Sequence, residues 1–196
     1  QDFNKQLEEY RNSLLLFSLE QKLVSQFLDT VITQQEIEAY YIENRSQFEL
    51  KGNIVKFDFV KINKRSRHAR EFRNLLKADK DESMMRLAEY AEKNATDYWF
   101  AGEWVSFNDL LDEMPLEVDN QELFLRRNSY AEATDSLFIY FVRINDFKTS
   151  DSISPLEFEK DKIRNIILNA RKIDLIERKR QEFIDQAFKE DKAKIF

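Results

Sequence analysis

Few residues in this sequence could serve as nucleophiles, metal ligands or proton carriers. The 196-residue chain contains no Cys and a single His, His68. Cys nucleophiles and disulfides are therefore excluded, and zinc sites built from Cys and His are nearly so. A Ser–His–Asp triad would have to use His68, which lies in the basic run of residues 65–70. That setting favours a surface histidine on a helix over a catalytic base.

Two other kinds of site would depend on carboxylates or on glycines, namely metal sites and phosphate-binding loops. Asp and Glu number 37, so the composition is compatible with a carboxylate metal site. The sequence has no spaced acidic motif such as a calcium-binding loop, and we expect neither a metal nor a cofactor. A loop that cradles phosphate needs several glycines close together, whereas the chain has only Gly52 and Gly102. P-loop and dinucleotide-binding fingerprints are therefore excluded.

The net charge and the hydropathy exclude two further classes of partner. The formal net charge is −6, and no segment has the basic excess typical of nucleic-acid binding. No apolar stretch approaches the roughly 20 residues of a membrane-spanning helix. We therefore expect no nucleic-acid partner and no membrane span. The chain begins with Gln1, which is typical of a processed or trimmed chain. The lack of a visible signal peptide therefore gives no information about the compartment.

Helices are predicted at the N-terminal end of the chain. Apolar residues spaced by three and four predict a helix over residues 5–29. After a short break, Thr33 and Glu36 match a capping box. This pattern predicts a second helix that runs to about residue 47.

A much longer helix is predicted at the C-terminal end. Ser154 suits the N-cap position, and Pro155 suits the first helical position. The helix that follows is expected to continue almost unbroken to the C-terminus. Its ~38 residues would span nearly 57 Å at ~1.5 Å per residue, which is too long to be buried in one small domain.

The middle of the chain mixes strands and helices. Residues 53–62 alternate with a period of two, which predicts a strand with Asp58 on its wetter face. Further along, the sequence predicts two helices, an extended aromatic segment, a short helix and a strong strand, at residues 65–77, 82–94, 98–106, 108–114 and 135–147 in that order.

These elements predict an α+β fold in two parts. The apolar faces of the two helical ends need a partner, and pairing them with each other is the simplest solution. We therefore expect residues 1–50 and 150–196 to form a discontinuous helical domain. Residues 51–149 would form a separate mixed domain inserted between them.

The order of motifs resembles that of SurA- and PrsA-like chaperones. Residues 33–48 resemble the segment that precedes the isomerase domain of those proteins, with matches at Thr33, Glu36, Ile37, Tyr40, Tyr41, Asn44 and Phe48. The next block resembles a parvulin domain, the PpiC-like rotamase type of peptidyl-prolyl isomerase. Its first strand matches Val55–Ile62, and its last strand matches Phe138–Ile144. Its Leu-Ala helix, with the following turn and Trp, matches Met85–Trp104. The resemblance covers nearly the whole chain and implies a helical chaperone-like domain with an inserted parvulin-like domain.

The isomerase site implied by this resemblance is degenerate. Active parvulins carry one histidine in the first strand and another in the last. Here Asp58, between two Phe residues, stands near the first of these positions, and Tyr140 stands near the second. Only Gly102 remains in the turn that is normally rich in glycine. We therefore expect no catalytic residues, with Asp58 and Tyr140 as degenerate positions and prolyl isomerisation lost or weak.

The leading hypothesis is a binding function. The resemblance implies a chaperone of the periplasm or cell envelope that holds unfolded or partly folded envelope proteins, including outer-membrane proteins. Its peptide-binding groove would be lined by Phe57, Phe59, Trp99, Trp104, Leu110, Met114 and Tyr140. Four aromatic residues of the N-terminal helices are instead expected to fill the core between helices, namely Phe17, Phe27, Tyr40 and Tyr41.

Two other hypotheses remain open from the sequence. The protein could be an active, divergent parvulin-type isomerase in which Asp58 and Tyr140 stand near the twisting bond. It could instead be a structural subunit that forms a homodimer through its helical arms. Alternating charges along the last helix, for example Arg171, Asp174 and Glu177, are typical of such an interface as well as of a solvated surface.

Overall fold

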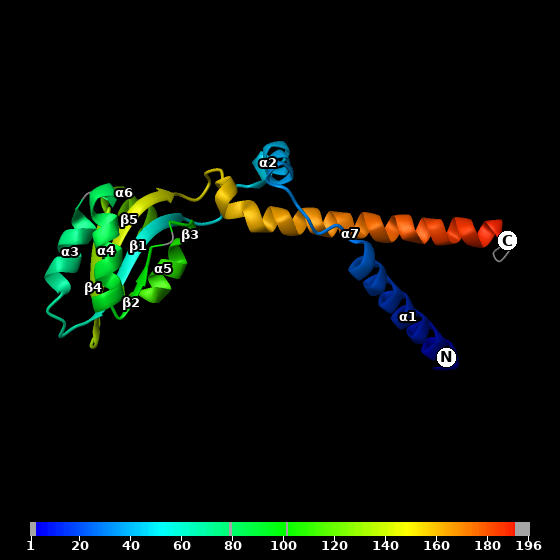
Figure 1. Cartoon of the computed structure of the whole chain (residues 1–196), viewed down its shortest axis with the longest axis horizontal. Coiled ribbons are helices and arrows are strands. Elements are labelled where there is room, and N and C mark those ends of the chain that lie inside the picture. Colours follow the sequence, from blue (N-terminus) through cyan, green and yellow to red (C-terminus); the bar gives the residue numbers. More distant parts are fainter. Residues whose placement is uncertain (1–2, 79, 101, 191–196) are drawn as a thin grey trace. The chain divides into compact units, whose positions relative to one another are not determined.

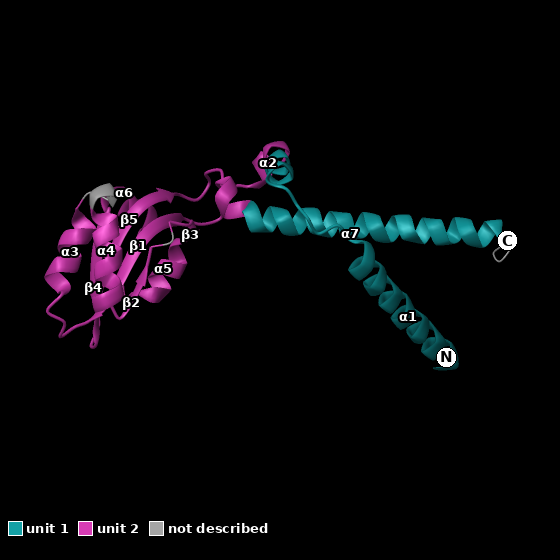
Figure 2. Cartoon of the chain, viewed as in Figure 1, with its two compact units in different colours: residues 1–41, 160–196 teal, residues 42–159 magenta. Residues whose placement is uncertain are grey.

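The chain combines helices with one antiparallel sheet (Figure 1). A computed structural model describes residues 3–78, 80–100 and 102–190, apart from the side chains of residues 80–82. The chain divides into two compact units (Figure 2). Unit 1 comprises residues 1–41 and 160–196, and unit 2 comprises residues 42–159.

Unit 1 contains most of three helices. Helix α1 spans Phe3–Phe27, α2 spans Gln34–Glu43, and α7 spans Leu156–Lys189. The second and last helices each cross a boundary between the units. At ~1.5 Å per residue, the 34 residues of α7 extend over about 51 Å. The last six residues of the predicted helix, 191–196, lie outside the described residues.

The predicted capping box at the start of α2 is confirmed. The Thr33 backbone N–H donates to Glu36 Oε2 over 2.9 Å, and the Glu36 N–H donates to Thr33 Oγ1 over 3.2 Å. The Thr33 N–H and the Thr33 hydroxyl both donate to Glu36 Oε2 and lower the pKa of the Glu36 carboxyl. Glu36 also pairs with Arg171 of α7, whose Nη1 donates to the Val31 carbonyl over 2.7 Å. The chain before α2 is thereby attached to α7.

The expectation that the N-terminal aromatics fill a core is wrong for Phe17 and Phe27. These side chains are 60% and 56% exposed, and no residue of α1 is buried. Tyr40 and Tyr41 in α2 are half-buried. The apolar residues of α1 include the consecutive run 14–17, which points in several directions around the helix axis. One neighbouring helix can cover only one of those directions.

Unit 2 is built on an antiparallel sheet with strand order β2-β1-β5-β4. In chain order its elements are β1 (Ile54–Asn63), α3 (Ala69–Lys77), α4 (Lys80–Asn94), β2 (Asp97–Trp99), β3 (Val105–Ser106), α5 (Phe107–Glu113), α6 (Gln121–Arg127), β4 (Tyr130–Thr134) and β5 (Phe138–Lys148). The short β3 pairs with β1 on the same side as β2.

Two of these elements, α6 and β4, carried no strong sequence signal. Helix α6 has only seven residues, and the Asn120 side chain caps it by accepting from the Leu123 N–H over 2.8 Å. Strand β4 alternates small Ala with polar or aromatic residues, so its apolar pattern is weak. Pairing with β5 defines it as a strand, from Tyr130 opposite Arg143 to Thr134 opposite Ile139.

Helices cover both faces of the sheet, with α3 and α4 on one face and α5 on the other (Figure 1). The core on the α5 face includes Phe57, Phe59, Phe107 and Tyr140. The core on the α3–α4 face is made by Val60, Ile62, Phe72, Leu75, Leu76, Leu87, Ala91 and Phe141.

This double covering overturns the expected wet face of β1. Asp58 has 0% exposure, although the alternating sequence placed it on the wetter face, and Val60 on the same face is equally buried. The reason is that β1 is a central strand whose second face is packed against α3 and α4. The local sequence shows the alternation, but it does not show that a second layer of helices covers the polar face.

Two segments near the ends of unit 2 pair with each other. Glu49 bridges Ile153, and the Leu50 N–H donates to the Ser152 carbonyl over 2.9 Å. Phe48 and Leu50 are buried there. Helix α7 begins next, at Leu156, two residues after the predicted N-cap, Ser154.

Candidate functional site

A cavity of about 240 Å³ opens on the α5 side of strand β1. It is lined by Phe57, Phe59, Asp97, Tyr98, Trp99, Val105, Asp109 and Glu113. Three of the seven residues predicted to bind peptide, Phe57, Phe59 and Trp99, therefore lie at this cavity. The other lining residues come from β2, β3 and α5 and were not anticipated from the sequence.

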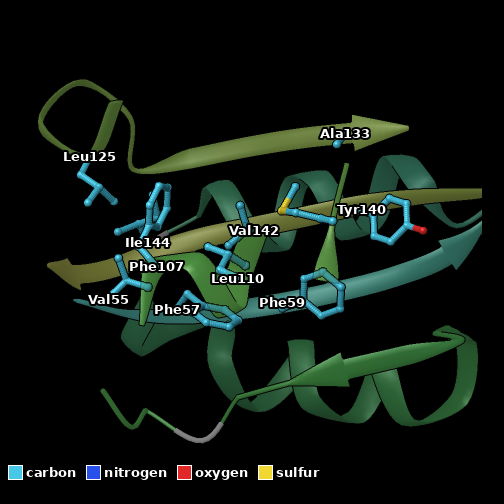
Figure 3. Packing of buried hydrophobic residues seen from close by; sticks show 11 residues of the cluster. Val55, Phe57, Phe59, Phe107, Leu110, Leu125, Ala133, Tyr140, Val142 and Ile144 are labelled. Atoms are coloured by element: carbon cyan, nitrogen blue, oxygen red, sulfur yellow. The ribbon is translucent and has the colours of Figure 1, made fainter. Parts of the chain in front are cut away.

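Strand register explains how the apolar part of the cavity is built. Phe57 and Phe59 are two residues apart on β1, so both point to the α5 face, as Figure 3 shows. Trp99 lies directly opposite Phe59 across the β1–β2 pair and therefore shares that face. The two Phe side chains are almost completely buried, whereas Trp99 is 44% exposed. The cavity thus has a buried aromatic floor and an exposed aromatic edge.

Leu110 and Met114 lie in the core rather than at the cavity. Their exposed fractions are 0% and 2%, and both pack with Val55, Phe57 and Phe59 in the same cluster. They are the apolar side of α5 and of the turn after it. They support the floor of the cavity and are not among its lining residues.

Tyr140 is buried beside the cavity with its hydroxyl already bonded. The hydroxyl donates to Asp135 Oδ2 over 2.7 Å, and the ring lies 6.3 Å from that of Phe59. The bond to the carboxylate raises the pKa of Tyr140 to about 12. It also holds the pKa of Asp135 below its usual range, together with the N–H donors of Phe138 and Leu137.

Trp104, the remaining predicted residue, lies away from this cavity. Lys56 Nζ stands 5.0 Å from the centre of the Trp104 ring, and Lys148 Nζ stands 6.0 Å from it. Lys56 also forms a 2.7 Å ion pair with Glu157, which lowers the pKa of that carboxyl. Trp104 is thus half-buried in a charged setting rather than at the cavity.

Asp58 belongs to a buried ion pair on the opposite face of the sheet. Arg143 lies opposite it in register, and Arg143 Nε donates to Asp58 Oδ2 over 2.9 Å. A second guanidinium nitrogen, Nη1, donates to Ser83 Oγ over 3.0 Å. Asp58 Oδ1 is buried with no hydrogen-bond partner in the described part of the chain. Asp58 faces the α3–α4 layer and Tyr140 faces α5, so they do not form one site.

Sequence reasoning missed the role of Arg143, although a signal was present. Arg143 is the one charged residue in the apolar run 137–144. Asp58 stands similarly alone between two Phe residues. Two opposite charges on two adjacent apolar strands indicate a cross-strand pair.

His68 does not approach the cavity. It immediately precedes α3, is half-buried, and places Nδ1 2.6 Å from Tyr90 Oη. The two rings meet edge to face, 5.6 Å apart. His68 therefore lies at the start of α3 without a side-chain capping bond and packs against Tyr90, rather than lying on an exposed helical surface as the sequence indicated.

Unit 1 holds a second, larger cavity between α1 and α7. Its volume is about 450 Å³, and its lining consists of Leu16, Leu19, Glu20, Leu23, Ile176, Arg180, Phe183 and Ile184. The only charged lining residues face each other, with Arg180 Nε 3.1 Å from Glu20 Oε1. Most of the apolar surface of α1 lies outside this cavity and is exposed, at Phe3, Leu7, Tyr10, Leu14, Leu15, Phe17 and Phe27.

Within residues 3–78, 80–100 and 102–190, no group of three or more acidic or histidine side chains is placed to hold a metal ion. No helix in those ranges is both long enough and apolar enough to cross a membrane.

Sequence comparisons give no relative. No protein-family model matches the chain, and no curated protein matches it. The comparison with solved structures does give matches.

Several solved structures are similar to this chain, among them the following two. One comes from work on the virulence factor PEB4 and the periplasmic protein Cj1289, two structurally related SurA-like chaperones of Campylobacter jejuni. It has 14% identity and a TM-score of 0.36, and the alignment covers 99% of this chain and 74% of that one. The other is the foldase protein PrsA of Streptococcus pneumoniae, with 16% identity, a TM-score of 0.28, and coverage of 100% of this chain and 67% of that one. TM-scores this low do not establish a shared overall fold, and the identities do not transfer residue roles.

Proposed function

We propose that this protein is a chaperone-like binder of unfolded or partly folded polypeptides. The observation that supports it is the surface of α1, where large apolar side chains are exposed along the whole helix and none is buried. Exposed apolar patches of this kind mark interaction sites on soluble proteins. The proposed setting is the periplasm or cell envelope, with envelope and outer-membrane proteins as clients.

The distribution of these side chains favours unfolded clients over one folded partner. Leu14, Leu15, Leu16 and Phe17 are consecutive and all more than half exposed. Successive residues turn by ~100° around a helix, so these four face in different directions. A single partner helix covers one stripe, whereas a flexible segment can wrap around several. The competing partner for this surface of α1 is a second copy of the chain.

We further propose that residues 51–149, which lie within unit 2, are a parvulin-like domain without efficient prolyl isomerase activity. The two degenerate positions support this view because each is engaged elsewhere. Asp58 pairs with Arg143, and Tyr140 donates its hydroxyl to Asp135 on the other face of the sheet. The proposed domains are a helical part, residues 1–50 and 150–196, and an inserted part, residues 51–149.

Suppression of aggregation tests the proposed function. An unfolded outer-membrane protein is diluted from denaturant with a several-fold molar excess of the full chain, and light scattering is followed. We expect scattering to fall, and we expect Leu15→Ser combined with Phe17→Ser to remove most of the effect. Both side chains are exposed, so the substitutions remove client surface without opening a core.

The matched control replaces exposed apolar residues of unit 2, Met85→Ser with Leu137→Ser. It should retain the suppression shown by the unmodified chain. No suppression by the unmodified chain, or equal loss in both variants, would contradict the proposal. A stable dimer in sedimentation that protects α1 would assign the surface to a second copy instead. The same preparation should not accelerate cis–trans exchange in a proline peptide.

A further inference from the structure

We propose that the unit 2 cavity selects client segments in which an apolar residue is adjacent to Lys or Arg. The proposal rests on the proposed function, because the occupant is a segment of an unfolded client. It adds a specificity to that function, which the exposed helix α1 alone does not supply.

The size of the cavity defines the kind of occupant. Its volume of about 240 Å³ lies below the ~300–1,000 Å³ of pockets that enclose a drug-sized ligand. That space holds one or two side chains. Its floor, formed by Phe57, Phe59 and Val105, is apolar, so the side chain that enters should be apolar.

The charges at the cavity are all negative. Asp97, Asp109 and Glu113 line it, and none of them forms an ion pair with another residue in the described ranges. No Lys or Arg is among the lining residues. Lys61 stands opposite Asp97 in register, but its Nζ lies over the Phe138 ring, 4.7 Å from the centroid.

The placement of two carboxylates on one side of the cavity strengthens the negative electrostatic potential there. Asp109 and Glu113 are four residues apart on α5, so they lie on the same face of the helix. Two carboxylates that both face a low-dielectric floor attract a cation more strongly than either does in open water. A cationic ligand would complement this field, and an anionic one would be repelled.

Access from solvent is available along β2. This strand is at the edge of the sheet, and its three residues, Asp97, Tyr98 and Trp99, are all exposed. A segment passing between β2 and α5 can place one apolar side chain on the floor. Its neighbouring Lys or Arg has a long apolar stem that lets the charge reach the carboxylates at the rim.

Trp99 fluorescence provides the test, with Trp104→Phe introduced so that Trp99 is the only tryptophan. Three acetylated and amidated peptides are titrated at low salt, Ala-Ala-Lys-Leu-Lys-Ala-Ala and its versions with Gln or Glu in place of Lys. We expect the Lys peptide to bind at least tenfold more tightly than the Glu peptide and severalfold more tightly than the Gln peptide. The preference should decline as salt is added, because salt screens exposed charges.

Charge-neutral variants then locate the selection. Asp109→Asn with Glu113→Gln should bring the three affinities within about twofold of one another. The matched control, Glu117→Gln with Asp119→Asn, makes the same change in charge at exposed positions outside the cavity and should retain the preference. Far-UV circular dichroism verifies that each variant is folded.

The outcomes separate this proposal from the proposed function. Equal binding of the three peptides, no binding of any, or a preference that persists in the Asp109 and Glu113 variant would overturn the selectivity. If the unmodified chain still suppresses aggregation in that case, the chaperone function stands. Loss of suppression by the unmodified chain overturns the function itself, whatever the peptides do.

Discussion

At the scale of single residues, the buried pair Asp58–Arg143 dominates the electrostatics of unit 2. Both side chains are almost completely buried, with exposures of 1% and 8%. Removing charges from water costs several kcal/mol, and that cost is offset by their mutual attraction and by the bonds from Arg143 to Ser83, Ala78 and Met84. Asp58 is therefore a structural carboxylate, although its position in the sequence suggested a degenerate catalytic one.

Loss of Asp58 should be strongly destabilising. Asp58→Ala leaves the Arg143 guanidinium buried without its carboxylate, and we expect a loss of about 3–5 kcal/mol in the free energy of unfolding. Urea denaturation at neutral pH measures it. The matched control is Glu122→Ala, which removes an exposed pair with Arg126 in the same unit and should cost less than ~0.5 kcal/mol. A loss at Asp58 as small as the control would contradict the assignment.

At the scale of elements, a motif whose interacting residues are close together in the sequence was predictable from the sequence. The capping box at Thr33 needs only residues three apart, and it forms as expected. Elements defined by distant partners were harder to predict. Strand β4 exists because β5 supplies its hydrogen bonds, and α6 is too short for a periodic pattern to stand out.

The cap at α2 can be tested by a single substitution. Thr33→Ala removes the oxygen that accepts from the Glu36 N–H and should cost about 1 kcal/mol locally. Hydrogen exchange in α2 should accelerate accordingly, by roughly fivefold. Thr30→Ala, an exposed threonine three residues earlier, is the matched control and should leave α2 unchanged. Equal acceleration in both variants would show that the side-chain cap contributes nothing.

At the scale of the whole molecule, the two units differ in how much core they hold. Almost all buried apolar residues belong to unit 2, where they form two clusters on either side of the sheet. In the described part of unit 1, the buried hydrophobic residues are Ile37, Ile163 and Leu175. Burial of apolar surface is the main stabilising contribution in folding, so the units should differ in stability.

Unfolding should therefore proceed in two steps rather than one. We expect unit 1 to unfold at lower urea concentration than unit 2, and the amides of α1 to exchange fastest in the native protein. Fluorescence of Trp99 and Trp104 reports on unit 2, and far-UV circular dichroism reports on the helices of both units. Coincident transitions by the two probes would contradict this expectation, because they indicate a single cooperative unit.

The sequence by itself determined the helical ends, the central strands and the exclusion of Cys-based and phosphate-loop chemistry. These conclusions depend on residue types and on spacing within one element, which the chain carries locally. Only the tertiary structure decided which predicted residues meet. Phe57, Phe59 and Trp99 share a cavity, Leu110 and Met114 lie beneath it, and Asp58 faces the other side. The exposure of α1 was also beyond the sequence, because an apolar side chain is buried only where the rest of the chain supplies surface to cover it.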